Sequence, residues 1–402
     1  MTQAGSTPAG RDLAALSVSL LQERVRTASA GRPVVARAPG RVNLLGGHTD
    51  YNHGFVLPAA TSQGTYVAAL PSFDGLYRVW SQAFEGQEVF EAEQFEQPSE
   101  TKTWGSYVRG VLWALRQADI DPVPFDAVIV GDVPIGSGLA SSAALEVATT
   151  LAALALAETH LDPKRTALLC QKAENEFVGV QCGVLDQFSS VFGREDSALL
   201  IDCRSLQVTA IPMGRTDLAL VVCDTAKPRG LVESEYNARR AQCERAARQL
   251  GVPALRDVTL EQLTRRRGDL GEVVYRRARH VVTENQRVLE GVHALRSGHL
   301  AELGELLTQA HASLRDDYEV SCPELDTMVQ IACGTEGCYG ARLMGAGFGG
   351  CVLAVVAAEA AQGFCELVEG RYRAQTGREG KTFITRPSQG AGLADQASGN
   401  AT

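Results

Sequence analysis

The sequence predicts an α+β protein with two domains, and two observations support this prediction. The chain has 402 residues, more than a single hydrophobic core usually organises. Strand-like and helix-like stretches are both present but do not alternate regularly, which argues against a doubly wound sheet or a barrel. We expect an N-terminal domain over residues 13–210 and a C-terminal domain over 211–388. Residues 1–12 and 389–402 are rich in small polar residues, and we expect them to be disordered tails.

The expected elements follow from local patterns. Runs of β-branched and apolar residues predict strands at 65–70, 127–130, 198–201, 219–223, 352–356 and 382–385. Apolar residues at helical spacing predict helices at 107–116, 141–157, 166–177, 233–249, 275–295, 300–314 and 323–332. The segment 206–217 lies between two strands and contains Pro212 and Gly214. We therefore place the crossover between the domains there.

Composition excludes several classes of function. Apolar residues make up 45% and charged residues 21% of the chain, as in ordinary globular proteins. The net charge of −9 argues against a nucleic-acid partner. The most apolar helix candidate, 139–157, contains Glu146 and is interpreted as a buried helix, so we expect no membrane partner. The N-terminus lacks the pattern of a signal peptide, and we expect a cytoplasmic protein.

The ten cysteines include no CxxC pair, and the spacing of Cys333 and Cys338 does not suit zinc. We interpret the cysteines as reduced, mostly buried residues.

A glycine-rich segment, PIGSGLASSAA at 134–144, follows an expected strand and opens an expected helix. Glycines let the backbone approach a ligand, and free N–H groups at a helix N-terminus bind anions. The segment is not a Walker A loop, because Leu139 and not Lys follows Gly138. On its own it indicates either a phosphate site or an ordinary helix cap.

Two further loops are unusual in composition. GRVNLLGGHTDY at 40–51 places Arg, Asn, His, Thr, Asp and Tyr close together, which suits a polyhydroxylated ligand. GAGFGG at 345–350 precedes the apolar run CVLAVVA and is also compatible with a simple turn into a strand.

These loops, in this order, resemble the galactokinase family of the superfamily that also contains homoserine, mevalonate and phosphomevalonate kinases. GRVNLLGGHTDYNHGFVLP is similar to the family's signature, and GDVPIGSGLASSAALEVA, ENEFVGVQCGVLDQFSS, SEYNARRAQCERA, RARHVVTENQRV, SLRDDYEVSCPELD and MGAGFGGC are further matches. The resemblance covers residues 33–388. It implies an N-terminal domain like domain 2 of ribosomal protein S5, a C-terminal ferredoxin-like domain and an active site between them. It also implies an enzyme that uses ATP and Mg²⁺ to phosphorylate the C1 hydroxyl of galactose. The sequence gives no firm oligomeric state, and we expect a monomer.

The resemblance assigns Asp186 as the catalytic carboxylate and Arg41 as its partner. Phosphoryl transfer depends on positioning and charge stabilisation, which such a pair can supply. An adjacent Arg keeps a carboxylate ionised, so that it can accept the proton of the sugar hydroxyl. Without the resemblance, the same residues could form an ion pair that joins two elements.

The resemblance also places ATP and magnesium. Ser142 and Glu174 match the metal ligands, and one hydroxyl with one carboxylate suits an ion that keeps several waters. Trp104 matches an aromatic residue beside adenine, although a Trp before a helix is commonly a core residue. The ATP phosphates are assigned to Gly136, Ser137, Gly138, Leu139, Ala140, Ser141 and Ser142.

The sugar site implied by the resemblance consists of Gly47, His48, Asp50, Gly183 and Tyr236. An Asp can accept hydrogen bonds from two sugar hydroxyls, and a glycine permits close approach of the backbone. His48 could instead order its loop, and Tyr236 could be a half-buried helix residue.

This chain departs from the family's pattern at two positions. Gly47 stands where the signature normally has a Glu that contacts the sugar near C6, and Met344 replaces a Thr. Two alternatives therefore stay open: a kinase for a sugar altered at C6, such as arabinose or galacturonate, and a non-catalytic sugar and ATP sensor.

Overall fold

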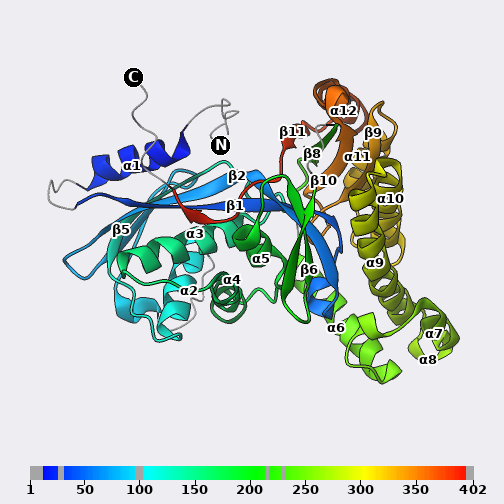
Figure 1. Cartoon of the computed structure of the whole chain (residues 1–402), viewed down its shortest axis with the longest axis horizontal. Helices are drawn as coiled ribbons and strands as arrows, with labels where there is room; N and C mark the ends of the chain where they lie inside the picture. The colour runs from blue at the N-terminus through cyan, green and yellow to red at the C-terminus, as the bar shows by residue number, and fades with distance from the viewer. Residues whose placement is uncertain (1–11, 26–30, 96–102, 214–216, 229–231, 395–402) are drawn as a thin grey trace.

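The computed structural model describes residues 12–25, 31–95, 103–213, 217–228 and 232–394. These residues form two β-sheets with helices packed against them (Figure 1). The predicted crossover residue Gly214 lies outside the described residues, as do 1–11 and 395–402 of the predicted tails.

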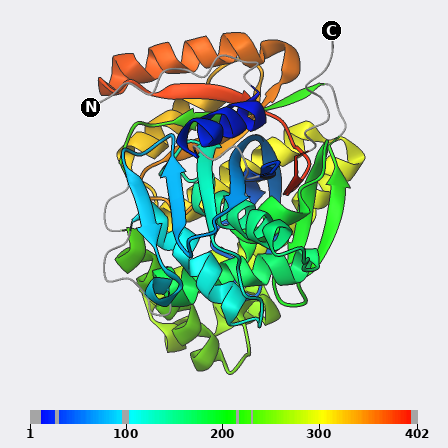
Figure 2. The same cartoon turned by 90° about the vertical axis from the view of Figure 1, so that its left-hand side faces the viewer.

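Within the described residues, the first sheet has eight strands in the order β12-β1-β2-β5-β3-β4, and β6 joins β2 and β7. All its strand pairs are antiparallel except β3–β5. Figure 2 shows β3 and β4 at one side of the sheet and β6 and β7 at the other. The strands are β1 (Val34–Leu45), β2 (Phe55–Pro71), β3 (Tyr77–Ser81), β4 (Gln87–Phe90), β5 (Phe125–Gly131), β6 (Ser197–Asp202), β7 (Gln207–Pro212) and β12 (Gly392–Leu393).

The middle of β2 contributes side chains to two separate cores. Val67 and Ala69 pack in the core on the face covered by α2 and α3, whereas Ala68 and Leu70 pack against α1. Successive residues of a strand point to opposite faces, so a strand buried on both sides is apolar throughout. The helices of this half are α1 (Leu13–Arg24), α2 (Trp104–Arg116), α3 (Ser141–Leu156), α4 (Pro163–Lys172), the π-helix η3 (Ala173–Val178) and α5 (Leu185–Phe192), with short 3-10 turns η1 (Asp50–Asn52) and η2 (Ala92–Phe95).

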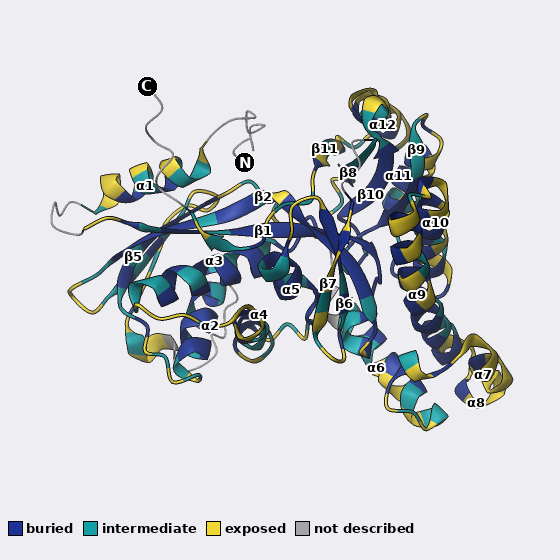
Figure 3. Cartoon of the chain, in the orientation of Figure 1, coloured by how far each residue is buried: buried dark blue, intermediate teal, exposed yellow. Residues whose placement is uncertain are grey.

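The second sheet is antiparallel, in the order β11-β8-β10-β9. Its strands are β8 (Leu218–Asp224), β9 (Cys338–Leu343), β10 (Cys351–Ala357) and β11 (Lys381–Thr385). The long helices α9 and α10 pack side by side (Figure 1), and exposed residues concentrate on the outlying α7 and α8 (Figure 3). The helices of this half are α6 (Val232–Leu250), η4 (Leu255–Asp257), α7 (Leu260–Arg265), α8 (Arg267–Leu270), α9 (Glu272–Ser297), α10 (Leu300–Asp316), α11 (Pro323–Cys333), η5 (Ala358–Ala360) and α12 (Ala361–Thr376).

The two sheets share a hydrophobic core. Val42 and Leu57 of the first sheet pack in one cluster with Val222 and Leu353 of the second and with Val288 of α9. The change from one sheet to the other falls between β7, which ends at Pro212, and β8, which begins at Leu218. The division into domains at residues 210 and 211 remains a prediction.

The predicted α+β class with two parts is confirmed, and each predicted strand and helix overlaps an element of the same type. Several elements were missed, among them β1, β3, β9, α5 and α12. The prediction of a disordered tail from residue 389 was wrong for its first residues. Gly392 pairs with Arg37 of β1, and Gly390 hydrogen-bonds with Gly193.

None of the helices in the described part of the chain is both long and apolar enough to cross a membrane.

Candidate active site

A cavity of about 590 Å³ collects residues from both halves of the molecule. Its wall includes all three glycine-containing loops of the sequence, through Gly47, Gly136, Gly138, Gly345 and Ala346. Predicted site residues that line it are Arg41, Gly47, His48, Asp50, Trp104, Gly136, Gly138, Ala140, Ser141, Ser142, Glu174, Gly183, Asp186 and Tyr236.

Arg41 and Asp186 form an ion pair in this cavity. Arg41 Nε and Nη2 lie 2.9 and 2.7 Å from Asp186 Oδ1. The Arg41 side chain is 6% exposed and that of Asp186 is 26% exposed, so the carboxylate is the partner that is open to a ligand. Arg41 lies in β1 between two irregularities of the strand register, and such irregularities redirect side chains. Asp186 stands in the first turn of α5. Arg41 also donates to the carbonyl oxygen of Gly138.

The loop before α3 has the backbone geometry of an anion site. Gly136 and Gly138 have φ values of 74° and 89°, and Ala140, the N-cap of α3, has φ 60°. The first N–H groups of a helix lack partners within the helix, so Ser141 and Ser142 lie where an anion is stabilised.

Two of the residues predicted to bind the phosphates do not line the cavity. Ser137 donates its hydroxyl to the carbonyl oxygen of Pro134 at 2.7 Å, and Leu139 packs in the shared core. Their side chains therefore hold the loop in place.

Glu174 lies at the back of the cavity, in the π-helix η3. π-Helical turns inside helices are frequent at functional sites, because they displace a side chain from its regular position. Glu174 is buried and hydrogen-bonded to Ser142, and Gln187 Nε2 donates to its Oε2 at 2.6 Å. Burial, followed by the charge of Asp186, raises the pKa of Glu174 to about 7.

Glu146 and Gln187 were not predicted as part of the site. Glu146, one turn beyond Ser142 in α3, is fully buried, and its Oε2 accepts from Gln187 Nε2 at 3.1 Å. Glu146 Oε1 and Gln187 Oε1 have no hydrogen-bond partner among the described residues. Burial and then Glu174 raise the pKa of Glu146 well above its usual value. The apolar surroundings of Glu146 in the sequence indicated only a buried helix.

Asp50 and Gly183 both line the cavity and lie close together. A Cβ at position 183 would collide with the carboxylate of Asp50, so only glycine permits this approach. Burial and then Asp186 raise the pKa of Asp50 to about 6. The two carboxylates, Asp50 and Asp186, therefore repel each other unless donors or a proton lie between them.

His48 uses both ring nitrogens within the protein. Nδ1 lies 2.8 Å from the hydroxyl of Tyr51, and Nε2 lies 3.2 Å from the carbonyl oxygen of Ala346. A carbonyl only accepts, so Nε2 carries the proton and the Tyr51 hydroxyl donates to Nδ1. Burial, followed by His280, lowers the pKa of His48 to about 3, which keeps the ring neutral. Tyr236 of α6 packs beside His48, with ring centroids 5.5 Å apart.

Trp104 begins α2 and stacks on a residue that was not predicted. Its ring and that of Phe84 are 6.1 Å apart and nearly parallel, at 6°. Both residues line the cavity, so two aromatic faces are available to a planar group there.

Gly47 and Met344, the two departures from the family's pattern, lie in different places: Gly47 lines the cavity and Met344 lies in the hydrophobic core. Gly47 lines the cavity, and a Cβ on it would lie 2.6 Å from Nη2 of Arg342. Arg342 is fully buried, and this Nη2 has no partner among the described residues. Met344 is buried in the shared core, and its neighbour Gly345 lines the cavity.

The fold and this site define a class, the two-domain small-molecule kinases. The model of the GHMP kinases N terminal domain matches residues 106–194, and that of the GHMP kinases C terminal domain matches 292–369. A mevalonate kinase from Methanococcus jannaschii has the same fold, with a TM-score of 0.64 at 17% identity over 89% of this chain and 99% of that one.

Within this class the chain belongs to the galactokinase family. The galactokinase galactose-binding signature matches residues 25–71. A galactokinase from Roseiflexus sp. (strain RS-1) is 45% identical over 94% of this chain and 97% of that protein. The structure of Lactococcus lactis galactokinase complexed with galactose has a TM-score of 0.90 at 34% identity, over 95% of this chain and 100% of that one. The family predicted from the sequence motifs is confirmed.

Proposed function

We propose that this chain transfers the γ-phosphoryl group of ATP to the anomeric C1 hydroxyl of galactose, giving galactose 1-phosphate and ADP. The observation that carries the proposal is the Arg41–Asp186 pair, which lies in one cavity with the glycine loop and the galactose-binding signature. Asp50, Gly183 and Tyr236 are assigned to the sugar, together with Gly47 and His48 at the edge of the same wall. Both ring nitrogens of His48 have protein partners. We therefore assign His48 a role in ordering its loop in addition to packing against the sugar.

In the proposed reaction, Asp186 orients the C1 hydroxyl and accepts its proton as the oxygen attacks the γ-phosphorus. The bond from that phosphorus to the β–γ bridging oxygen breaks, ADP leaves, and Asp186 releases the proton to solvent. Arg41 lies between Asp186 and the carbonyl of Gly138, so it can stabilise negative charge on the transferring group. The loop 136–142 is assigned to the phosphates, and Trp104 with Phe84 to adenine.

The donor set also fits magnesium, although the described residues include no cluster of three or more metal-ligating side chains. Ser142 and Glu174 would hold the ion, and phosphate oxygens and waters would complete its shell. The fit rests on the buried Glu174 carboxylate, which is hydrogen-bonded to the uncharged side chains of Ser142, Cys182 and Gln187. Burial raises its pKa to about 7. Magnesium would neutralise charge on the phosphates when bound.

The test is release of ADP with a panel of sugars at saturating ATP. We expect galactose to be the best substrate. A specific observation favours a second candidate, a sugar altered at C6: Gly47 lies beside Arg342 Nη2, which has no hydrogen-bond partner among the described residues. Better turnover of L-arabinose or galacturonate than of galactose would replace the proposal with that candidate. Galactose binding without ADP release would indicate a sensor.

We also infer that the protein acts in a reducing compartment such as the cytoplasm, as a monomer. All ten cysteines are free, which supports the first part. Light scattering after size-exclusion chromatography tests the second part, and a dimer would contradict it.

A further inference from the structure

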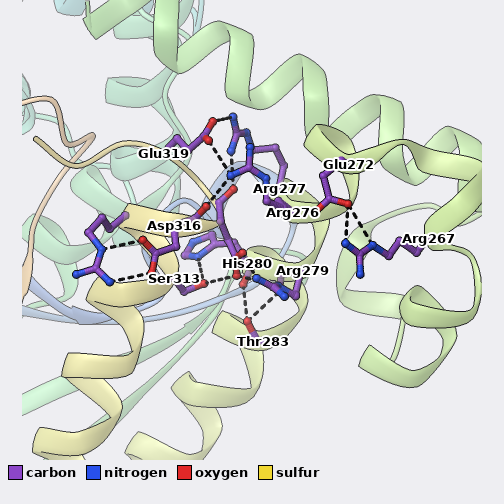
Figure 4. A network of polar contacts seen from close by, with 12 residues as sticks. Arg267, Glu272, Arg276, Arg277, Arg279, His280, Thr283, Ser313, Asp316 and Glu319 are labelled. Atoms are coloured by element: carbon purple, nitrogen blue, oxygen red, sulfur yellow. Dashed lines mark hydrogen bonds and ion pairs between the residues drawn. The ribbon is translucent and has the colours of Figure 1, made fainter.

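One motif of the sequence, RARHVVTENQRV, has no part in the reaction described above. It lies in α9 and contains His280, Glu284 and Asn285. His280 and Glu284 are four residues apart and share a face of the helix, and Asn285 directly follows Glu284. His280 and Glu284 are fully buried and Asn285 is 7% exposed. Figure 4 shows His280 at the centre of a network of polar contacts between α9 and the end of α10.

These three side chains bind the backbone at both ends of the loop 46–55, here called the sugar loop. Glu284 Oε1 accepts from the N–H groups of Gly46 at 2.8 Å and Gly47 at 3.0 Å. His280 Nε2 lies 2.9 Å from the carbonyl oxygen of Gly47. Asn285 Oδ1 accepts from the N–H of Phe55 at 2.7 Å. Four backbone groups of the sugar loop therefore have partners on one helix of the other half.

The orientation of the His280 ring is fixed at both nitrogens. A carbonyl accepts only, so Nε2 carries the proton and donates to Gly47. Nδ1 then accepts from the hydroxyl of Ser313, at 2.9 Å. Burial lowers the pKa of His280 to about 4, so the ring stays neutral. Beyond Ser313, the ion pair Arg277–Glu319 (Figure 4) holds α9 to the segment after α10. The ion pair Arg279–Asp317 does the same.

Two arginines keep Glu284 ionised. Its Oε2 accepts from Arg287 Nε at 2.7 Å, and Arg342 Nη1 lies 3.3 Å from its Oε1. Burial alone would raise the pKa of Glu284, but Arg287 and Arg342 lower it to about 2. The carboxylate is therefore available to both loop N–H groups at every working pH.

The sugar loop needs such support because its own backbone is unfavourable. Gly46, His48 and His53 have φ values of 92°, 61° and 55°. Non-glycine residues rarely adopt this left-handed region, and they keep it only where the surroundings impose it. The same loop presents His48 and Asp50 to the cavity.

We propose that His280, Glu284 and Asn285 of α9 are positioning residues that hold the sugar loop in the shape that binds the sugar. The proposal rests on the proposed function, since it takes the ligand beside Asp50 to be a sugar. It makes α9 the element through which the C-terminal half sets the affinity of a site formed mainly by the N-terminal half.

The test compares two substitutions of one residue. His280→Leu fills the space but removes the donor, whereas the side-chain amide of His280→Gln can still donate to the carbonyl oxygen of Gly47. We expect His280→Leu to raise the sugar KM by about tenfold, as for a lost buried hydrogen bond, and to leave the KM for ATP within about twofold. His280→Gln should recover most of the sugar KM although both variants lose stability.

The matched control is His311→Leu, which removes a buried histidine of α10 that contacts Asp326 and not the sugar loop. It should lower Tm without changing the sugar KM. Hydrogen exchange of the 46–55 amides supplies a readout that needs no substrate, with faster exchange in His280→Leu and wild-type exchange in His311→Leu. If His280→Leu does not fold, Asn285→Ala removes the acceptor of the Phe55 N–H and should show a smaller change of the same kind.

Two results would overturn the proposal: unchanged exchange in the sugar loop of either α9 variant, or equal increases in the KM values for sugar and ATP. A wild-type protein that does not phosphorylate galactose would instead contradict the proposed function. The exchange experiment would still decide the role of α9, and the KM comparison would use the best sugar of the panel.

Discussion

Both Nε and Nη2 of Arg41 contact the same oxygen of Asp186, Oδ1, at 2.9 and 2.7 Å. No described residue hydrogen-bonds the other oxygen, Oδ2. An arrangement in which an arginine takes one carboxylate oxygen leaves the second to accept a proton from a substrate hydroxyl.

The first prediction follows from this geometry. Asp186→Asn keeps the shape of the side chain but removes the anionic acceptor. We expect kcat to fall by about a hundredfold or more, in line with the contribution of a general base, while the affinity for ATP is largely kept. The control is Asp257→Asn, which breaks an exposed pair with Arg204 (2.9 and 2.7 Å) outside the cavity and should leave kcat unchanged. Near-normal turnover in Asp186→Asn would remove Asp186 from the catalytic role.

The second prediction compares the same substitution at two buried glutamates. Glu174→Gln should raise the Mg²⁺ concentration needed for half-maximal activity by about tenfold or more, because an amide is a poorer ligand than a carboxylate. Glu146→Gln should change it little. The new amide can donate to Gln187 Oε1, which has no partner within the described ranges, and it can still accept from Gln187 Nε2. Magnesium titrations of the two variants make the comparison, and equal effects would contradict the assignment of Glu174, and not Glu146, as the magnesium ligand.

The contrast between these glutamates also shows what the sequence could predict. Arg41, Asp186, Asp50 and Glu174 were predicted because each lies in a motif that resembles a family with known chemistry. Glu146 was not, since a single carboxylate in an apolar helix is informative only when its neighbours in space are known. Its partner Gln187 is 41 residues away along the chain.

The missed strands have a similar explanation. β1 is buried on both faces and contains Pro39 and Gly40, so it shows neither the alternation nor the uninterrupted apolar run that predicts a strand. β9 contains Gly340, whose missing side chain lets α10 approach at Gly304. Such close backbone contacts are properties of the packed structure, and local sequence patterns do not report them.

The third prediction concerns pH. Burial and Asp186 raise the pKa of Asp50 from 3.8 to about 6. Between pH 3.8 and about 6 the folded protein keeps a proton on Asp50 that the unfolded chain has released. This difference in proton binding stabilises the folded state at low pH, and the stabilisation is lost as the pH rises through about 6. The ionised carboxylate is an acceptor at both oxygens, whereas protonation turns one of them into an O–H donor. The Kd for galactose, measured without ATP, should therefore rise as the pH falls below about 6.

Asp50→Asn separates the two effects. The variant should lose the pH dependence of galactose binding and bind weakly at every pH, since an amide offers one acceptor in place of two. It should also be more stable than the wild type at pH 7, by an amount of order 1 kcal/mol, because no buried charge has to form. A galactose Kd that stays constant between about pH 5 and pH 8 in the wild type would show that Asp50 does not titrate in this range.

The fourth prediction concerns Gly47, which stands where the signature normally has Glu. A carboxylate that accepts a hydrogen bond from a sugar hydroxyl contributes about 1.5–3 kcal/mol. The absence of this carboxylate should weaken galactose binding by roughly ten- to a hundredfold. A water molecule in its place would recover part of this affinity. The missing carboxylate should also reduce discrimination at C6, so that 6-deoxygalactose, L-arabinose and galacturonate are penalised less than in relatives with Glu.

The structure adds a condition to the substitution Gly47→Glu. The new Cβ would lie 2.6 Å from Arg342 Nη2, so the guanidinium has to move, and Leu314 lies 3.4 Å away on the same side. Arg342 Nη2 has no hydrogen-bond partner in the part of the chain that the structure describes, and the new carboxylate can supply one. We therefore expect some loss of Tm, a lower KM for galactose and a sharper preference for an intact C6 hydroxyl.

Gly47→Ala is the matched control, because it displaces Arg342 in the same way without adding a carboxylate. It should lose Tm and gain nothing with galactose, so the difference between the two variants measures the carboxylate alone. KM values for galactose and the three analogues, with Tm for each variant, make the comparison. If Gly47→Glu binds galactose no better than Gly47→Ala and accepts the analogues equally well, then Gly47 is only a loop glycine. Specificity at C6 would in that case have to come from residues on the other side of the cavity.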